Sequence, residues 1–391
     1  MSGHELLMIA PAPAVGLPGG RVRLDAKFLE GARLHAQHWD GPVRFILWEN
    51  EHNPFGQEVN EAGLGFSLTL LKPGQSVTEE HLRDVTLVAA SADMHENYDL
   101  PELTKRVGAK LVYVIEYTLG IRLRILWLER ERSLIRKLRS TLWHVQQERR
   151  CRRAMRAADG LQFNGWPVQN AYARLNGNYL LYLDGRMRKD MMVSPEKLGE
   201  RMARLNSGAP IRIAHSGRLE PLKGAQDLVP VARALIAARV DFTLDIWGMG
   251  SLLSEIRTQI AKDGLQDRVR LHDPLPFETG LIPALHEQAD LFLSCHRQAD
   301  PSCSYLEAMG CGLPVIGYDN DMLHDLALAS QAARVVKMGD ANALAQAIRE
   351  WSSDRAALFA AAGRALHFAQ AHDFETEFAR RMDHLKKTAH G

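Results

Sequence analysis

Residues 211–224 read Ile-Arg-Ile-Ala-His-Ser-Gly-Arg-Leu-Glu-Pro-Leu-Lys-Gly, a short apolar run that passes into a glycine-containing loop. The run Ile211–His215 predicts a buried strand, and a glycine after it lets the backbone turn sharply. Arg218 and Lys223 fall in the loop. Two cations in one loop suit a diphosphate, whose charge grows as its bond to a sugar breaks. A solvated basic loop is the alternative interpretation.

Short apolar runs alternate with longer helical patterns along the chain, which is typical of a parallel sheet flanked by helices. The predicted strands are 6–10, 43–48, 86–90, 110–115 and 160–163 in the first half, and 211–215, 241–247, 269–271, 291–294 and 314–317 in the second. A polar helical segment, 195–205, and the linker Asn206-Ser-Gly208 separate the two series. The predicted fold class is therefore α/β, with two Rossmann-like domains facing each other across a cleft.

The domain boundaries follow from this linker. We place an N-terminal domain at residues 1–207 and a C-terminal domain at 208–370. A C-terminal helix is predicted over 371–391, and we expect it to pack back on the N-terminal domain.

The bulk composition is that of a soluble globular protein, with 391 residues, 46% hydrophobic, 24% charged and a formal net charge of +1. These values exclude a disordered or collagen-like chain, and the length suggests two or three domains. The four cysteines form no Cys-x-x-Cys pair, and no window approaches the ~20 apolar residues that span a bilayer. We therefore expect a cytoplasmic protein without a disulfide framework or a structural metal site.

Two further motifs lie at strand ends in the second half. Residues 244–250, Leu-Asp-Ile-Trp-Gly-Met-Gly, run from a strand into a turn with Gly248, a pattern that by itself closes many βα units. Residues 300–316 read Asp-Pro-Ser-Cys-Ser-Tyr-Leu-Glu-Ala-Met-Gly-Cys-Gly-Leu-Pro-Val-Ile, with a helix predicted from Ser304. The amides of Ser302, Cys303 and Ser304 would then lie at a helix N-terminus, where phosphate binds.

Two carboxylates accompany that helix start. Asp300 and Glu307 lie two helical turns apart, and a carboxylate paired with a diol is a recurrent way of holding ribose. For Glu307 alone, a carboxylate favoured by the helix dipole is an equally simple interpretation.

In this order, the motifs resemble the retaining glycosyltransferases of family 4, which have the GT-B fold, over about residues 211–350. In that family a Gly-Arg-x4-Lys-Gly loop contacts the donor diphosphate, which implicates Gly217, Arg218 and Lys223. The family's Glu-x7-Glu element ends in Leu-Glu-Ala-Met-Ala-Cys-Gly-x-Pro-Val, which residues 306–315 match closely. The resemblance implies that Glu307, the second glutamate, binds ribose.

The sequence departs from the family pattern at two places. The first glutamate of the element would fall at Ala299, and the nearest carboxylate is Asp300, one residue later. In the family that acid contacts the donor sugar, so this contact is assigned here to Asp300. Relatives often place Gly-Gly after the strand at 314–317, whereas this chain has Tyr318-Asp-Asn-Asp321.

The N-terminal half is assigned to the acceptor by elimination. Residues 11–20 are predicted to form a long loop that ends in Gly19 and Gly20, and similar enzymes carry a Gly-Gly loop here, facing the donor. Two predicted strands, 86–90 and 110–115, lead to His95 and Glu116. In the family the second of these strands often ends in a His-Asp-like pair, and here Glu116 takes the histidine's place. We interpret Glu116 as orienting the acceptor hydroxyl or steadying an oxocarbenium charge, with His95 as a further catalytic candidate. Solvated polar residues at strand ends, and a plain flexible turn at the glycines, are the alternatives.

Residues 121–156 carry most of the charge asymmetry. Eleven arginines and one lysine face three glutamates, a net charge of +9, so the remaining residues carry −8. At about 100° per residue, seven apolar side chains fall within roughly 120°; they are Trp127, Leu128, Leu134, Ile135, Leu138, Leu142 and Val145. We expect this helix to contact an anionic membrane, at the inner face of the cytoplasmic membrane, or a polyprenyl-diphosphate acceptor. A helix packed on the domain with a solvated arginine face is the alternative, and nothing else in the sequence supports nucleic-acid binding.

These observations predict a retaining, metal-independent hexosyltransferase. Its donor would be a nucleotide diphosphate sugar, a co-substrate rather than a cofactor, and its acceptor a hydroxyl of a lipid-linked or polysaccharide-precursor glycan. Two other interpretations fit the residues: a GT-B-related sugar-nucleotide epimerase, which needs no acceptor, and a non-catalytic subunit that only binds the nucleotide sugar.

Overall fold

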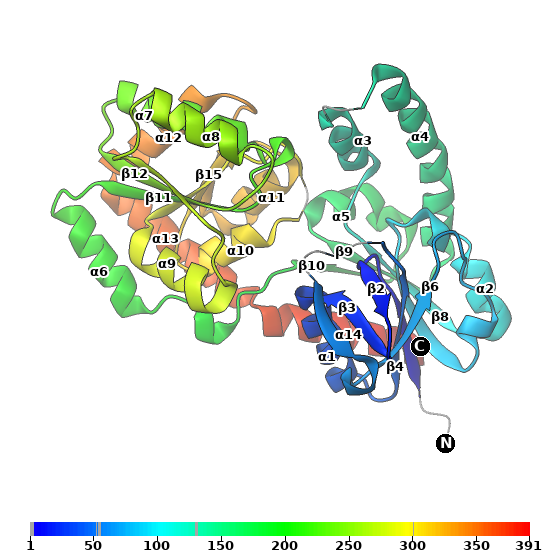
Figure 1. Ribbon diagram of the computed structural model, residues 1–391. Coiled ribbons are helices and arrows are strands. Elements are labelled where there is room, and N and C mark those ends of the chain that lie inside the picture. Colours follow the sequence, from blue (N-terminus) through cyan, green and yellow to red (C-terminus); the bar gives the residue numbers. More distant parts are fainter. Residues whose placement is uncertain (1–3, 52, 54–55, 130–131, 300) are drawn as a thin grey trace. The chain divides into compact units, whose positions relative to one another are not determined.

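The computed structural model describes residues 4–51, 53, 56–129, 132–299 and 301–391 (Figure 1). The chain folds into two compact units. The first comprises residues within 1–119, 138–182 and 378–391, and the second residues within 120–137 and 183–377. This division differs from the predicted boundary after residue 207, because α6 (Pro195–Asn206) belongs to the second unit.

A seven-stranded, fully parallel sheet forms the centre of the first unit, in the order β10-β9-β8-β7-β1-β4-β6. The strands are β1 (Glu5–Ile9), β4 (Val43–Trp48), β6 (Ser67–Leu71), β7 (Val85–Ser91), β8 (Lys110–Ile115), β9 (Gly160–Asn164) and β10 (Tyr179–Tyr182). The central strands are buried on both faces, which explains their nearly continuous apolar sequence.

A small antiparallel sheet, β2-β3-β5, accompanies the large one. Its strands are β2 (Ala14–Leu17), β3 (Arg21–Asp25) and β5 (Gly56–Asn60). The predicted long loop over residues 11–20 is therefore wrong. Gly19 and Gly20 are exposed at the tip of the β2–β3 hairpin, with φ of 77° and 69°. Glycine suits this tip because two successive residues adopt positive φ.

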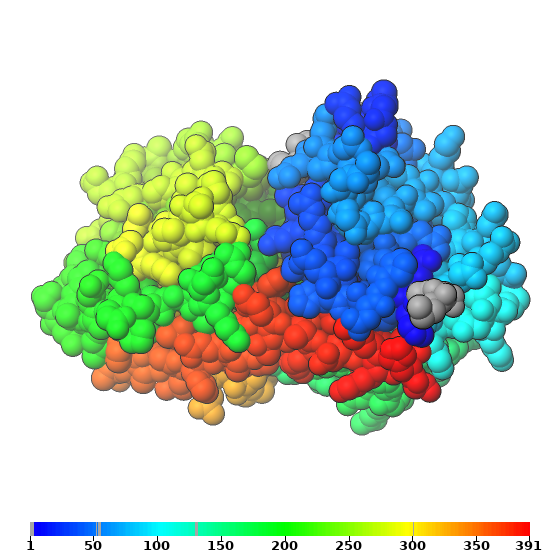
Figure 2. Space-filling model, turned by 90° about the horizontal axis from the view of Figure 1, so that it is seen from below, coloured from blue at the N-terminus to red at the C-terminus, as the bar shows by residue number. Residues whose placement is uncertain are grey.

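Helices cover both faces of the first sheet. The helices of this unit are α1 (Ala26–His38), α2 (Leu100–Val107) and α5 (Trp166–Tyr172), together with most of α4 (Leu134–Ala157) and of α14 (Phe374–His390). The residues of α14 from Phe378 onward belong to the first unit, where the ring of Phe378 lies 5.0 Å from that of His35 in α1. Figure 2 shows this C-terminal segment in red beside the blue N-terminal residues.

A six-stranded, fully parallel sheet forms the centre of the second unit, in the order β13-β12-β11-β14-β15-β16. The strands are β11 (Ile211–Ser216), β12 (Phe242–Trp247), β13 (Val269–His272), β14 (Leu291–Ser294), β15 (Val315–Tyr318) and β16 (Ala333–Val336). The strand order reverses between β11 and β14. In open α/β sheets, ligands bind at such a switch point, outside the carboxyl ends of the strands.

Figure 1 shows α7, α8 and α12 on one face of this sheet and α9, α10 and α13 on the other. The helices of the unit not yet bounded are α7 (Leu228–Ala237), α8 (Leu253–Lys262), α9 (Ile282–Gln288), α10 (Cys303–Gly310), α11 (Asp321–Ser330), α12 (Ala341–Ser353) and α13 (Arg355–Ala371). A continuous apolar core joins the strands to α7, α8, α12 and α13.

The basic segment 121–156 is not one helix. It divides into α3 (Leu119–Leu128) and α4, and Lys137 Nζ donates to the carbonyl oxygen of Trp127 at 3.0 Å, which ties the start of α4 to the end of α3. In the part of the chain that the structure describes, no helix is both long enough and apolar enough to cross a bilayer.

Candidate functional site

The loop 217–224 follows β11 and is fixed against the end of β12. The amide of Gly217 donates to the Trp247 carbonyl at 3.1 Å, and that of Leu219 donates to the Met249 carbonyl at 2.8 Å. A Cβ at Gly248 would lie 2.0 Å from the carbonyl oxygen of Gly217. The Gly-x-Gly turn therefore lets two loops pack backbone against backbone, which no larger residue would allow.

The far end of the same loop packs against the end of β14. Gly224 has a φ of 68°, and a Cβ there would lie 1.7 Å from the Cys295 carbonyl oxygen. The amide of Arg297 donates to the Leu222 carbonyl at 3.0 Å. The loop is thus held between the carboxyl ends of β12 and β14, at the point where the strand order reverses.

The two cations of this loop differ in exposure. Arg218 is exposed, whereas Lys223 ends a single 3₁₀ turn, Pro221–Lys223, and is only 8% exposed. The pKa of the buried His296 lies well below its ordinary value, first because of burial and then because of the positive charge of Lys223, with a smaller effect of Arg218. Both cations therefore act on one place at the carboxyl end of β14. An anion is the ligand that such a place favours.

His215, at the end of β11, contributes to the same region. Its Nδ1 lies 3.0 Å from the Leu293 carbonyl, and burial, rather than the charge of Lys223, is the larger cause of its lowered pKa. His215 and His296 are therefore neutral near pH 7. They add polar groups beside the two cations without adding charge.

The N-terminus of α10 lies next to His296. Ser302 is the N-cap residue, and its own side chain does not cap the helix. Ser302 Oγ instead lies 2.7 Å from Ser304 Oγ, and Cys303 Sγ donates to the Asp184 carboxylate at 3.7 Å. The amides and the dipole at a helix N-terminus favour a phosphate or carboxylate group.

A buried polar network beneath α10 was not anticipated from the sequence. The Tyr305 hydroxyl lies 3.2 Å from Ser294 Oγ and 3.4 Å from His296 Nδ1. Asn320 Nδ2 donates to the His296 carbonyl at 3.2 Å, and Asn320 Oδ1 accepts from the Leu323 amide and so caps α11. This explains the departure at Tyr318-Asp-Asn-Asp321, because Asn320 joins a helix cap to the loop after β14.

Of the two carboxylates predicted to bind the donor, Glu307 and Asp300, the structure describes only Glu307. Glu307 is buried in the second turn of α10, and its charge adds to burial in raising the pKa of the Cys311 thiol. Ala299, which replaces the family's first glutamate, is fully buried. Asp300 lies outside the described residues, so its proposed contact with a sugar stays a prediction.

In the first unit, Glu116 and His95 lie after neighbouring strands, β8 and β7. The Glu116 carboxylate accepts from Asn164 Nδ2 at 3.2 Å, and the Asp93 carboxylate accepts from the amide of Glu116 at 2.8 Å. His95 Nδ1 lies 3.1 Å from the Glu96 carboxylate, and its ring lies 5.1 Å from that of Trp143. Glu116 is therefore held by side chains at strand ends, whereas His95 contacts its own turn and α4.

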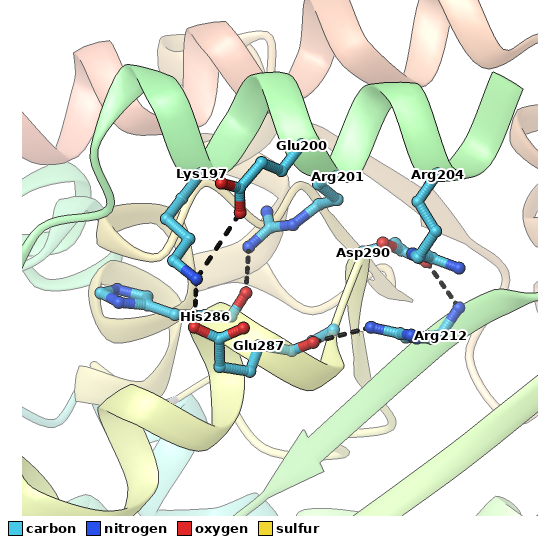
Figure 3. A pocket seen from close by; sticks show the side chains of 9 residues that line it. Lys197, Glu200, Arg201, Arg204, Arg212, His286, Glu287 and Asp290 are labelled. Carbon is cyan, nitrogen blue, oxygen red and sulfur yellow. Dashed lines mark hydrogen bonds and ion pairs between the residues drawn. The ribbon is translucent and has the colours of Figure 1, made fainter.

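A separate polar pocket lies at the opposite edge of the second sheet, near the amino ends of β11 and β14 (Figure 3). Arg201 on α6 donates there to the carbonyls of Cys311 and Gly312, at 3.1 and 3.0 Å. The Arg212 amide donates to Asp290, whose other contact is an ion pair with Arg204. These charges are largely matched within the pocket, so its evident role is to attach α6 to the second unit.

Part of the second unit matches a known protein family. Residues 210–354 match the protein-family model described as Glycosyl transferases group 1. Amylovoran biosynthesis glycosyltransferase AmsK of Erwinia amylovora is 29% identical over 172 residues, which is 42% of this chain and 42% of AmsK. The GDP-mannose-dependent alpha-(1-6)-phosphatidylinositol monomannoside mannosyltransferase of Mycolicibacterium smegmatis is 31% identical over 157 residues, 38% of this chain and 40% of that protein. The matches thus span less than half the length of these curated relatives.

The solved structure of Anabaena HepE in complex with UDP has a TM-score of 0.68 to this chain, at 16% identity, and covers 98% of this chain and 100% of HepE. At that identity the likeness gives the fold alone. The chain has the GT-B fold, with two Rossmann-like domains, and the predicted fold class is confirmed.

Proposed function

We propose that this protein is a retaining glycosyltransferase of family 4 that moves a hexose from a nucleotide diphosphate sugar to a hydroxyl acceptor. The observation that carries the proposal is the position of the loop that bears Arg218 and Lys223, which is held between the carboxyl ends of β12 and β14. This arrangement lies at the strand-order reversal of a domain that matches the group 1 family model. The structures of HepE with UDP and with UDP-glucose support a nucleotide-sugar donor.

In the proposed reaction, the bond between the sugar's anomeric carbon and the diphosphate oxygen breaks. A bond from the same carbon to the acceptor oxygen forms on the same face, and the acceptor's proton passes to a phosphate oxygen of the leaving nucleotide. Arg218, Lys223 and the amides near Ser302 stabilise the charge that develops on the diphosphate. Because these groups neutralise the leaving group, the proposed reaction requires no metal ion.

Five further predicted residues have a role in this proposal. Glu307 would accept hydrogen bonds from the ribose hydroxyls, and Asp300 would contact the donor sugar. In the first unit, Glu116 would orient the acceptor hydroxyl, because Asn164 fixes its carboxylate at a strand end. We keep Gly19 and Gly20 as proposed acceptor-side contacts. The named functions of the bacterial relatives favour a lipid-linked or polysaccharide-precursor glycan as acceptor.

The test begins with the donor. A thermal-shift screen of nucleotide sugars identifies the one that stabilises the protein most, because a ligand that binds only the folded state raises its apparent stability. Turnover of that donor is then measured in Arg218→Ala and Lys223→Ala, with Arg349→Ala, an exposed arginine on α12, as the matched control. We expect at least a ~100-fold loss in kcat for each site variant and none for the control.

Three outcomes would count against this proposal. Unchanged turnover in both site variants contradicts the diphosphate contact. Donor consumption that proceeds fully without any acceptor favours an epimerase, and nucleotide binding without turnover on any acceptor favours a non-catalytic subunit.

A further inference from the structure

The N-terminal half of α4 is a helix surface that the protein core does not cover. In the C-terminal half, Cys151, Ala154 and Met155 are buried in the core of the first unit. Residues 134–147 are all described by the structure, and of these fourteen residues only Lys137 is buried. Figure 1 shows α4 extending beyond the sheet of its unit. Over its first three turns this helix therefore exposes most of its side chains to solvent.

Five large aliphatic residues lie on one side of these turns, and we call them the apolar stripe: Leu134, Ile135, Leu138, Leu142 and Val145. Their exposed fractions run from 42% for Val145 to 71% for Ile135. At about 100° per residue they fall within an arc of about 100°, and they extend for about 16 Å along the helix. An apolar surface of this size on an otherwise charged segment indicates a contact with a partner.

Further along α4, the side that carries the apolar stripe carries exposed arginines instead of apolar residues. Arg149, Arg153 and Arg156, here called the arginine stretch, fall within the angular range of the apolar stripe and are all exposed. Among the described residues no carboxylate pairs with them, whereas the neighbouring Arg150 and Arg152 pair with Asp99 and Glu148. The outward side of α4 thus presents an apolar half followed by an unpaired cationic half.

We propose that this side of α4 docks the protein on an anionic phospholipid surface, a property independent of the reaction proposed above. The apolar stripe would enter the boundary between headgroups and acyl chains, and the arginine stretch would contact the lipid phosphates. Charge complementarity selects this partner over a neutral apolar surface. Five exposed aliphatic side chains disfavour nucleic acid, which is bound by cations and aromatic rings.

Vesicle co-sedimentation tests the proposal on the full chain. The vesicles are equal parts phosphatidylglycerol and phosphatidylcholine, with pure phosphatidylcholine for comparison. The stripe variant combines Leu138→Glu with Leu142→Glu. Its matched control combines Ile236→Glu with Leu328→Glu, two exposed aliphatic residues on α7 and α11. We expect the stripe variant to lose at least ~10-fold in partitioning to the anionic vesicles and the control to match the wild type.

The charge contribution is tested separately. Arg149→Gln with Arg153→Gln should weaken binding to anionic vesicles and reduce its dependence on salt, whereas Arg257→Gln with Arg349→Gln, exposed arginines on α8 and α12, should not. Circular dichroism and thermal unfolding confirm that each variant is folded, as expected for substitutions at exposed positions.

Three results would overturn the proposal. The first is no binding of the wild type to anionic vesicles, and the second is equal binding by the stripe variant and its control. The third is a wild-type dimer that the stripe variant converts to a monomer, since α4 would then contact a second copy of the chain.

Discussion

Gly224→Ala introduces a methyl group into a position closed by backbone. The Cβ would lie 1.7 Å from the carbonyl oxygen of Cys295 and 2.6 Å from its carbonyl carbon. Both are main-chain atoms at the end of β14, so no rotamer change relieves the overlap. Alanine at a φ of 68° costs about 1–2 kcal/mol, and relieving an overlap in a packed region costs about 1–3 kcal/mol more. We expect a loss of about 2–5 kcal/mol in the free energy of unfolding.

The matched control is Gly264→Ala. Gly264 has a φ of 62° in the same unit, but no described atom lies within 4 Å of a Cβ built there. This variant should lose only the conformational part, about 1–2 kcal/mol. Urea unfolding of both variants therefore isolates the contribution of the overlap with Cys295.

Nucleotide binding supplies the second readout. Because Gly224 fixes the loop that carries Arg218 and Lys223, its substitution should also reduce the thermal stabilisation produced by a nucleoside diphosphate. Gly264→Ala should leave that stabilisation unchanged. Equal losses of stability in the two variants, with equal nucleotide responses, would refute the reasoning that this loop is held by the end of β14.

Three further predictions concern other parts of the molecule. Burial, with the charge of Arg381 as the second cause, lowers the pKa of His35 to about 4. Between pH 6.5 and 4 the unfolded chain therefore binds a proton at this residue that the folded chain does not bind, and the free energy of unfolding should fall by about 2 kcal/mol from pH 7 to pH 5. Urea unfolding of His35→Gln should lack this loss. Arg201→Met removes the donor of hydrogen bonds to three carbonyls and should cost about 3 kcal/mol, whereas a change below about 1 kcal/mol in urea unfolding would contradict a structural role. Glu116→Gln should lower kcat at least ~10-fold with unchanged nucleotide affinity. An unaltered kcat would contradict the proposal that Glu116 orients the acceptor hydroxyl.

The buried strands were predictable because their apolar character is nearly continuous. The runs at 43–48, 110–115 and 291–294 coincide with β4, β8 and β14, which lie inside the two sheets. The edge strands β6 and β10 were missed. β6 mixes polar and apolar residues because it is partly exposed, and β10 is a run of only four residues. Sheet β2-β3-β5 was missed because its short strands are separated by a Pro-Gly-Gly turn that suggests a loop.

The site was predictable where local sequence imposes the chemistry. A strand at 211–216, followed at 217–223 by a glycine and two cations, specifies a loop at the carboxyl end of a strand. The polar network of Ser294, Tyr305, His296 and Asn320 joins residues from three separate segments, and only the fold brings them together. The periodicity at 121–156 indicated an amphipathic surface, but it could not show that the apolar stripe lies in solvent or that the helix breaks before Leu134.

The central claim is that Arg218 and Lys223 bind the diphosphate of the donor. Calorimetric titration compares a nucleoside diphosphate with the corresponding monophosphate in the wild type, Lys223→Ala, Arg218→Ala and the control Arg349→Ala. The account predicts that each site variant loses at least ~10-fold in affinity for the diphosphate and much less for the monophosphate, because the lost contact is made by a charged group. Equal affinity for the diphosphate in all four proteins would contradict it.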